Sequence, residues 1–169
     1  MKKLSKLVAL LLAGAMAMLM LTACGSNISG EDKQAEEAVM TQIRAKGSAT
    51  QNLDNDRELR NIAAQNLDND INIGFGNYLF TSKVHLKGIK PAEENIVFTI
   101  TAKYDYTDTR LDKLLDRLLA KINSDGNNDS GININESGNW TKVGVVVKNV
   151  KGQSYLAISI QVKNPRYKK

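Results

Sequence analysis

The chain of 169 residues contains a single cysteine, a single histidine and two prolines, and these scarcities exclude some chemistry at once. One thiol, that of Cys24, cannot form a disulfide within the chain, so stability must come from an ordinary apolar core. The lone His85 has no nucleophile beside it in the sequence, which argues against a Ser–His–Asp or Cys–His catalytic arrangement. No glycine-rich loop of the phosphate-binding type occurs either.

The first twenty-three residues have the pattern of an export signal. A basic start with Lys2, Lys3 and Lys6 precedes the uncharged apolar run 7–21, which ends at small residues. This run is too short to span a bilayer, for which about 20 residues are needed, and is typical of a secretory signal peptide. The tetrad Leu21-Thr22-Ala23-Cys24 resembles the lipobox of bacterial lipoproteins. The resemblance implies cleavage before Cys24, lipid attachment to its thiol, and a location on the extracytoplasmic face of the cell membrane.

Removal of the signal peptide changes the charge of the protein. The three lysines of residues 1–23 leave with it, so 23 basic residues become 20 against 18 acidic ones. A mature chain so close to neutral loses most of the support for nucleic-acid binding. We therefore predict four parts: the signal peptide 1–23, a lipidated spacer 24–32, one domain over 33–165, and a basic tail 166–169.

Periodicity places helices and strands along the domain. Apolar residues at helical spacing predict helices over 31–46, over about 57–67 following a cap at Asp54 or Asp56, and over 111–122. Alternation from Asn95, and two apolar runs over 140–148 and 154–163 with a reversal at 150–153, predict antiparallel strands. Residues 74–88 are assigned to a loop with some strand character near 84–86. The expected fold class is α+β, with helices packed on a small antiparallel sheet.

Several stretches, taken in order, resemble the CAP domain of cysteine-rich secretory proteins, antigen 5 and plant pathogenesis-related proteins, also called the SCP-like extracellular domain. The matching stretches are Gln42–Gly47, then Leu53, Asp56, Glu58, Leu59 and Ala63, then Glu93-Glu94-Asn95-Ile96, and finally Trp140–Val146 with Tyr155. The resemblance covers most of residues 33–163. It implies a three-layer α-β-α sandwich, in which helices flank the small antiparallel sheet, and a cleft.

The departures from this family bear on function. Many members place two histidines and two glutamates in a cleft, a set able to hold a divalent metal. Here only His85 and Glu94 match as cleft candidates; Asn66 stands where some members carry a histidine, and residues 123–126 lack the second one. One histidine and one glutamate cannot make a four-ligand site. The resemblance therefore predicts a domain without catalytic activity and without a cofactor.

The loop 125–136 leaves one metal open as an alternative. Counted from Asp125, positions 1, 3, 5, 9 and 12 of a calcium loop are oxygen-bearing residues. These are Asp125, Asn127, Asp129, Asn133 and Glu136. Position 6 is Ser130 rather than glycine, and a strand is expected where a second helix should follow. The sequence thus favours a lipoprotein that binds an unidentified envelope ligand, with a calcium-stabilised adhesion module and a lipid or sterol carrier as the alternatives.

Overall fold

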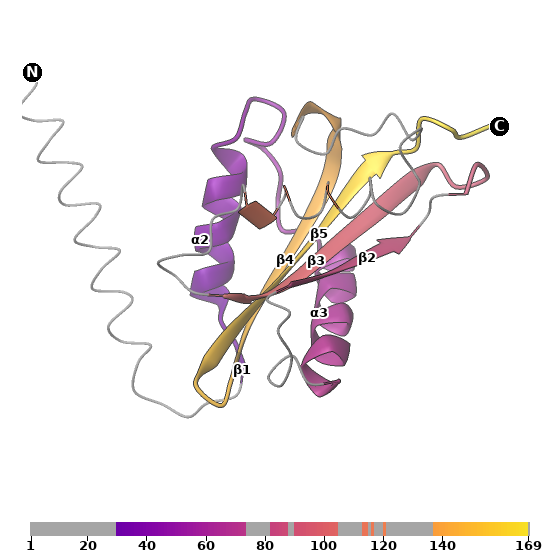
Figure 1. Cartoon of the computed structure of the whole chain (residues 1–169). Coiled ribbons are helices and arrows are strands. Elements are labelled where there is room, and N and C mark those ends of the chain that lie inside the picture. The colour runs from indigo at the N-terminus through magenta and orange to yellow at the C-terminus, as the bar shows by residue number, and fades with distance from the viewer. Residues whose placement is uncertain are drawn as a thin grey trace, which may run out of the picture.

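The computed structural model describes residues 30–73, 82–87, 90–104, 113–114, 116, 120 and 137–168. Two long helices and five strands make up this part of the chain (Figure 1). In order they are β1 (Gly30–Glu31), α2 (Lys33–Arg44), α3 (Arg57–Asn72), β2 (Ser82–Lys87), β3 (Asn95–Tyr104), a short 3-10 turn (Ser137–Asn139), β4 (Trp140–Val150) and β5 (Gln153–Lys163). The mixed α+β class predicted from the sequence is confirmed.

The five strands form one antiparallel sheet in the order β1-β4-β5-β3-β2. The central strand β5 pairs along its length with β3 on one side and β4 on the other. The predicted reversal at 150–153 is confirmed, because Lys151 and Gly152 both adopt positive φ angles of 50° and 78°. Two such residues form the tight turn that suits the twist of a hairpin.

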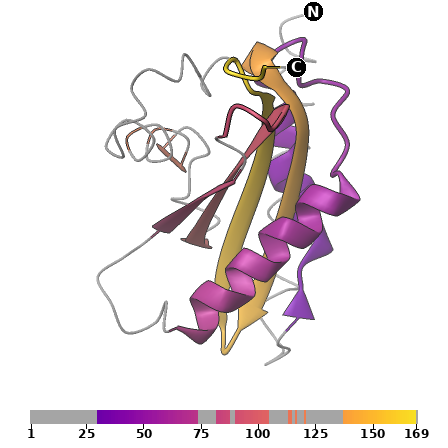
Figure 2. The same ribbon diagram turned by 90° about the vertical axis from the view of Figure 1, so that its right-hand side faces the viewer.

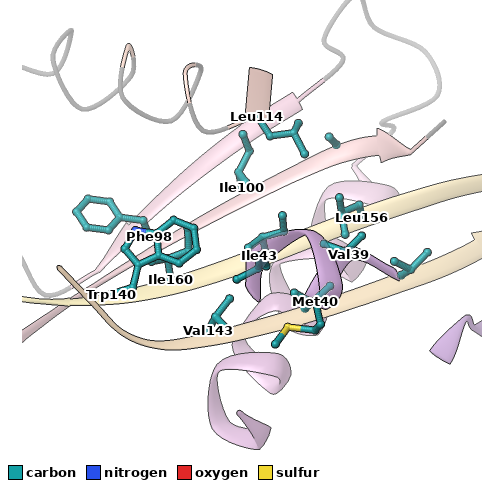
Figure 3. Close-up of a cluster of buried hydrophobic side chains, with 14 of the residues drawn as sticks. Val39, Met40, Ile43, Phe98, Ile100, Leu114, Trp140, Val143, Leu156 and Ile160 are labelled. Atoms are coloured by element: carbon teal, nitrogen blue, oxygen red, sulfur yellow. The ribbon is translucent and has the colours of Figure 1, made fainter. Parts of the chain in front are cut away.

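One face of the sheet carries the larger apolar core, beneath α2. Val39, Met40 and Ile43 of the helix are buried against alternate residues of β3, β4 and β5 (Figure 3). The predicted alternation in β3 is confirmed here, since Phe98 and Ile100 lie in this cluster. Residues one apart in a strand point to opposite faces, so a second helix can cover the remaining side chains.

The other face is covered by α3, which crosses in front of the sheet in Figure 2 with α2 behind. Ala63 and Leu67 pack on Val146, Tyr155 and Ala157. Both faces of β4 are thus buried, which explains its nearly continuous run of valines in place of a polar alternation. The small residue Gly144 lies directly beneath the first turn of α3, so close that a Cβ there would stand 2.2 Å from the backbone nitrogen of Arg60.

Aspartate side chains cap both helices. Asp56 accepts a hydrogen bond of 3.0 Å from the backbone of Leu59, which selects it over Asp54 as the predicted cap of α3. The cap of α2 is Asp32, whose carboxylate accepts from Ala35 at 2.9 Å. A side-chain acceptor satisfies one of the orphan N–H groups in the first helical turn.

The outer edge of β4 is covered in part by residues that were predicted to belong to the spacer. Gly30 and Glu31, assigned to the spacer 24–32, pair instead with Asn149 and Lys148 as β1. Farther along, the Asn55 side chain donates to Val145 O at 2.9 Å and accepts from Val145 N at 2.7 Å. Residues 30 and 31 therefore belong to the folded domain. A polar cover of this kind also hides an edge that would otherwise pair with another chain.

Residues 82–87 form a full edge strand paired with β3. The strand character predicted near 84–86 is confirmed, and the strand is longer than predicted, so the loop assigned to 74–88 is wrong at residues 82, 83 and 87. The helix predicted over 111–122 lies mostly outside the described residues. The described positions within it, 113–114, 116 and 120, are helical. Leu114 is buried in the larger core, where Figure 3 draws it beside Ile100.

Candidate functional site

The only histidine lies on the edge strand β2, on the face covered by α3. His85 pairs across the sheet with Thr99, and its Nε2 lies 2.8 Å from the Oδ2 atom of Asp70 near the end of α3. The Asp70 side chain is 3% exposed, whereas that of His85 is 33% exposed. For Nε2 to donate to a carboxylate it must carry the proton, so a neutral ring presents its Nδ1 lone pair on the other side.

Asp70 accepts two further donors, and we call Asp70, Lys83, His85 and Thr101 the Asp70 cluster. The Thr101 hydroxyl donates to Oδ2 at 2.5 Å, and Lys83 Nζ lies 3.1 Å from Oδ1. Burial raises the pKa of Asp70, but the hydrogen bonds from Thr101, His85 and Lys83 outweigh it and hold the pKa below the ordinary value. The cluster thus keeps a charged carboxylate under α3, where it fixes the orientation of the imidazole.

The Asp70 cluster predicts an acid-sensitive contribution to stability. A carboxyl group whose folded pKa is lowered stabilises the fold above its unfolded pKa of about 3.9, and this stability is lost as the pH falls through the folded value. Asp70→Asn should therefore cost about 1–3 kcal/mol at pH 7. It should also flatten the decline in the free energy of unfolding below about pH 4.

Urea unfolding of both proteins between neutral pH and pH 2 measures that difference. Asp68→Asn, an exposed change two residues away whose carboxylate pairs with Lys148, provides the control. Parallel curves for wild type and Asp70→Asn would show that the carboxylate is not charged in the fold.

The structure does not bring the two cleft candidates together. Glu94 precedes β3, five residues from Thr99, the cross-strand partner of His85. At about 3.4 Å per residue this separates the two positions by roughly 17 Å. Glu94 is exposed, and its backbone carbonyl accepts a 2.8 Å hydrogen bond from Asn164. The carboxylate beside His85 is instead Asp70, which the sequence reading did not select.

The other sequence candidates lie outside the described residues. They are Cys24 with the signal peptide, residues 123–126, and the calcium loop with Asp125, Asn127, Asp129, Asn133 and Glu136. Asn66 is described and lies half-buried on α3. In the described ranges no group of three or more His, Cys, Asp or Glu side chains is placed to hold a metal ion.

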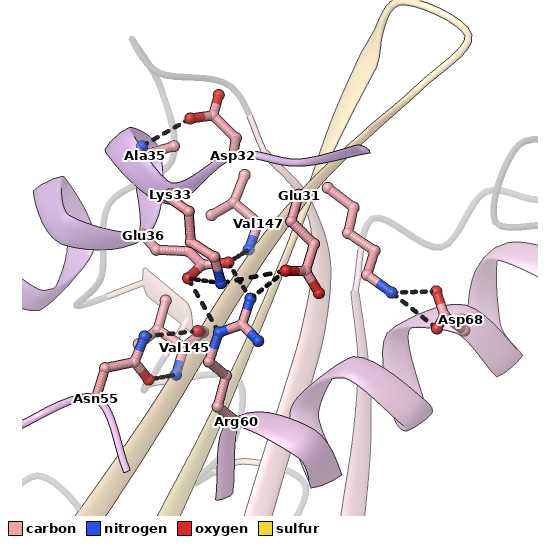
Figure 4. Close-up of polar contacts among 11 residues, drawn as sticks. Glu31, Asp32, Lys33, Ala35, Glu36, Asn55, Arg60, Asp68, Val145 and Val147 are labelled. Carbon is pink, nitrogen blue, oxygen red and sulfur yellow. Dashed lines mark hydrogen bonds and ion pairs between the residues drawn. The ribbon is translucent and has the colours of Figure 1, made fainter. Parts of the chain in front are cut away.

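A second charged group joins the two helices to the sheet edge, and we call Glu31, Lys33, Glu36 and Arg60 the Arg60 cluster (Figure 4). The guanidinium of Arg60 donates to both oxygens of Glu36, at 3.1 and 2.8 Å, and to Glu31 at 2.7 Å. The Glu36 side chain is 5% exposed. The hydrogen bond to Glu36 is the main cause that raises the pKa of Arg60, and the one from Arg60 lowers the pKa of Glu31. The geometry of the Arg60 cluster indicates a structural role, because its ion pairs join β1, α2 and α3.

A third polar site holds the end of the chain. Asn164 is buried, and its side-chain amide donates to the carbonyls of Lys90 and Glu93 at 2.9 and 2.7 Å. Its Oδ1 atom accepts from the backbone of Arg166, and Lys168 N donates to Pro91 O at 3.0 Å. Residues 166–168 of the predicted basic tail therefore fold back onto the segment 90–94. Asn164 had no signal in the sequence, because its partners lie some seventy residues away.

None of the helices in the described ranges has the length and apolar character that crossing a bilayer requires. Neither a protein-family profile, nor a curated protein, nor a solved structure matches this chain.

Proposed function

We propose that this protein is a bacterial surface lipoprotein, acylated at Cys24, whose single domain binds an envelope ligand and is not an enzyme. The observation that carries the proposal is the sequence Leu21-Thr22-Ala23-Cys24 after a basic start and an apolar run. Two or three acyl chains hold a protein on a membrane where one would dissociate, since each buried methylene contributes about 0.8 kcal/mol. The partners are the membrane, through the lipid, and an envelope ligand.

The start of β1 supports a close attachment. Five residues lie between Cys24 and Gly30, where the chain enters the sheet. The six Cα-to-Cα steps from Cys24 to Gly30 span at most about 20 Å when fully extended. An anchored domain would therefore stay within a short distance of the bilayer, with the β1 end of the sheet nearest to it.

A non-catalytic domain is favoured by the surroundings of His85. Its carboxylate partner Asp70 is buried and also bound by Thr101 and Lys83, so the charge that would activate an imidazole is already shared. Glu94, the second residue carried over by the CAP resemblance, lies at the far end of β3. The CAP-like three-layer fold is part of this proposal, supported by the packing of α2 and α3 on opposite faces of an antiparallel sheet.

Substitution of the thiol tests the anchor. In a bacterial host, Cys24→Ala should abolish incorporation of radiolabelled palmitate into the protein and shift it out of the lipid-anchored membrane fraction. Ser26→Ala, a small polar change two residues on, should label as the wild type does. Equal palmitate labelling of the Cys24→Ala chain, or none in the wild type, would contradict acylation at this residue.

Activity assays test the second half of the proposal. The purified protein should leave peptides and cell-wall polymers uncleaved. Hydrolysis that is lost in His85→Ala and kept in an exposed control such as Gln65→Ala would show an enzyme and overturn the proposal.

A further inference from the structure

We propose that the end of the domain farthest from the anchor binds a linear anionic polymer of the cell envelope. Five cations gather there, and we call them the basic end. They are Lys87, Lys90, Lys163, Arg166 and Lys168. All are exposed except Arg166, which is half-buried.

Backbone contacts fix these cations at one place. Lys90 and Lys168 are brought together because Lys168 N donates to Pro91 O, while the Asn164 amide holds the carbonyl of Lys90. Lys163 pairs with Asn95 at the same end of β3. Arg166 is tied to Asn164 Oδ1 at 2.9 Å. The basic end is thus part of the folded domain, and its charges are held near one another before any ligand arrives.

Charge is segregated toward this end. Its two segments contribute only Glu93 and Glu94 as carboxylates, so five cations leave an excess of three. The chain from Cys24 onward has 20 basic and 18 acidic residues, an excess of two, so the rest is slightly negative. Within the described ranges, ion pairs such as that of Lys148 with Asp68 involve none of the five cations. A local positive surface on a near-neutral protein attracts polyanions.

The position of the basic end favours a polymer over the anchoring membrane, a step that rests on the proposed acylation. β1 pairs with Lys148 and Asn149 beside the 150–153 turn, whereas Lys163 ends β5 at the opposite end of the sheet (Figure 1). The eleven residues of β5 span about 33 Å. Because the tether holds the β1 end within about 20 Å of the bilayer, a domain standing upright on its anchor presents the basic end away from the membrane.

Binding of the detergent-solubilised full chain to long-chain polyphosphate, a soluble linear polyanion, tests the proposal. We expect saturable binding that weakens with salt, because each neutralised phosphate releases a counterion. The variant Lys90→Gln/Arg166→Gln/Lys168→Gln should bind at least about tenfold more weakly at low salt, with a log–log salt slope smaller by about 2. The matched control Arg57→Gln/Lys103→Gln/Lys151→Asn removes the same charge elsewhere and should bind nearly as the wild type does.

Several outcomes would overturn the proposal. One is no binding of the wild-type chain at low salt, and another is equal weakening in the two triple variants. A third is preference for phosphatidylcholine vesicles containing phosphatidylglycerol over polyphosphate, which would assign the basic end to lipid headgroups. Circular dichroism and thermal melts confirm that both variants are folded. Because binding by the solubilised protein needs no lipid, unacylated Cys24→Ala should bind polyphosphate as well, and this test remains decisive if acylation fails.

Discussion

Gly144→Ala should lower the melting temperature of the domain by about 10 °C or more. The added Cβ would stand 2.2 Å from Arg60 N, 2.3 Å from the Leu59 carbonyl carbon and 2.7 Å from Leu59 Cβ. Two of these three atoms belong to the backbone of α3, so no rotamer change removes the overlap. The helix must shift away from the sheet, and Leu59 and Leu67, both buried, would lose part of their packing.

The size of this effect follows from overpacking of a rigid contact. An extra methyl group in a well-packed core costs typically about 1–3 kcal/mol, and backbone overlap places this site at or above the upper end. For a domain of this length each kcal/mol shifts the midpoint by about 3–4 °C. Thermal unfolding followed by far-UV circular dichroism measures the shift.

Gly138→Ala is the matched control, because a Cβ at that exposed glycine meets nothing within 4 Å. It should melt within about 2 °C of the wild type. Equal melting of the Gly144→Ala protein and the wild type would mean that α3 does not lie on β4 as described.

The Gly144 contact illustrates how far the sequence could predict the fold. The stretch 140–148 was read correctly as a strand from its valines, and Gly144 was part of the family resemblance. The reason for the glycine is the crossing of α3, which begins more than eighty residues earlier. Periodicity reports which face of an element is apolar and does not report which distant element covers it.

The same limit applies to the elements that were missed. β1 has two residues, too few for any alternation to be visible, and it exists because β4 offers unpaired backbone groups. In β2 the sequence Ser-Lys-Val-His-Leu-Lys alternates, but Lys83 and His85 both bind the buried Asp70 of α3. The strand was therefore predicted only near 84–86, and the carboxylate that pairs with the histidine was not predicted.

The grouping of the candidate site residues was predicted less accurately than the helices and strands. His85 and Glu94 were paired because a family motif suggested it, and their separation follows from the register of β2 on β3. Register depends on the partner strand, which a single sequence does not specify. The packing of residues 166–168 against the segment 90–94 could not be predicted, because nothing local in the sequence indicates the hydrogen bonds of Asn164.

Arg60→Met should destabilise the domain by about 3–5 kcal/mol at neutral pH, because it removes one partner of a buried ion pair. Glu36 would be left 5% exposed with only Lys33, itself 63% exposed and 3.2 Å away, as a cationic partner. Methionine matches much of the length of arginine, so the loss of packing is small and the uncompensated carboxylate accounts for most of the cost. Urea unfolding measures the difference in free energy.

The reverse substitution should cost less. Glu36→Gln leaves Arg60 with Glu31, whose carboxylate is 39% exposed and 2.7 Å from Nη2, so the guanidinium keeps a partner and some contact with water. We expect a loss of about 1–2 kcal/mol from the weakened hydrogen bonds to the buried side chain.

The double variant Arg60→Met/Glu36→Gln completes the cycle, and it should be more stable than Arg60→Met alone although it carries one more substitution. Replacing the stranded carboxylate by a neutral amide removes the buried charge, and two residues in direct contact couple by about 1–3 kcal/mol. Additive losses across the cycle would show that Glu36 and Arg60 do not interact in the folded protein. Such a result would mean that no ion pair between these residues joins α2 to α3 at the edge of the sheet.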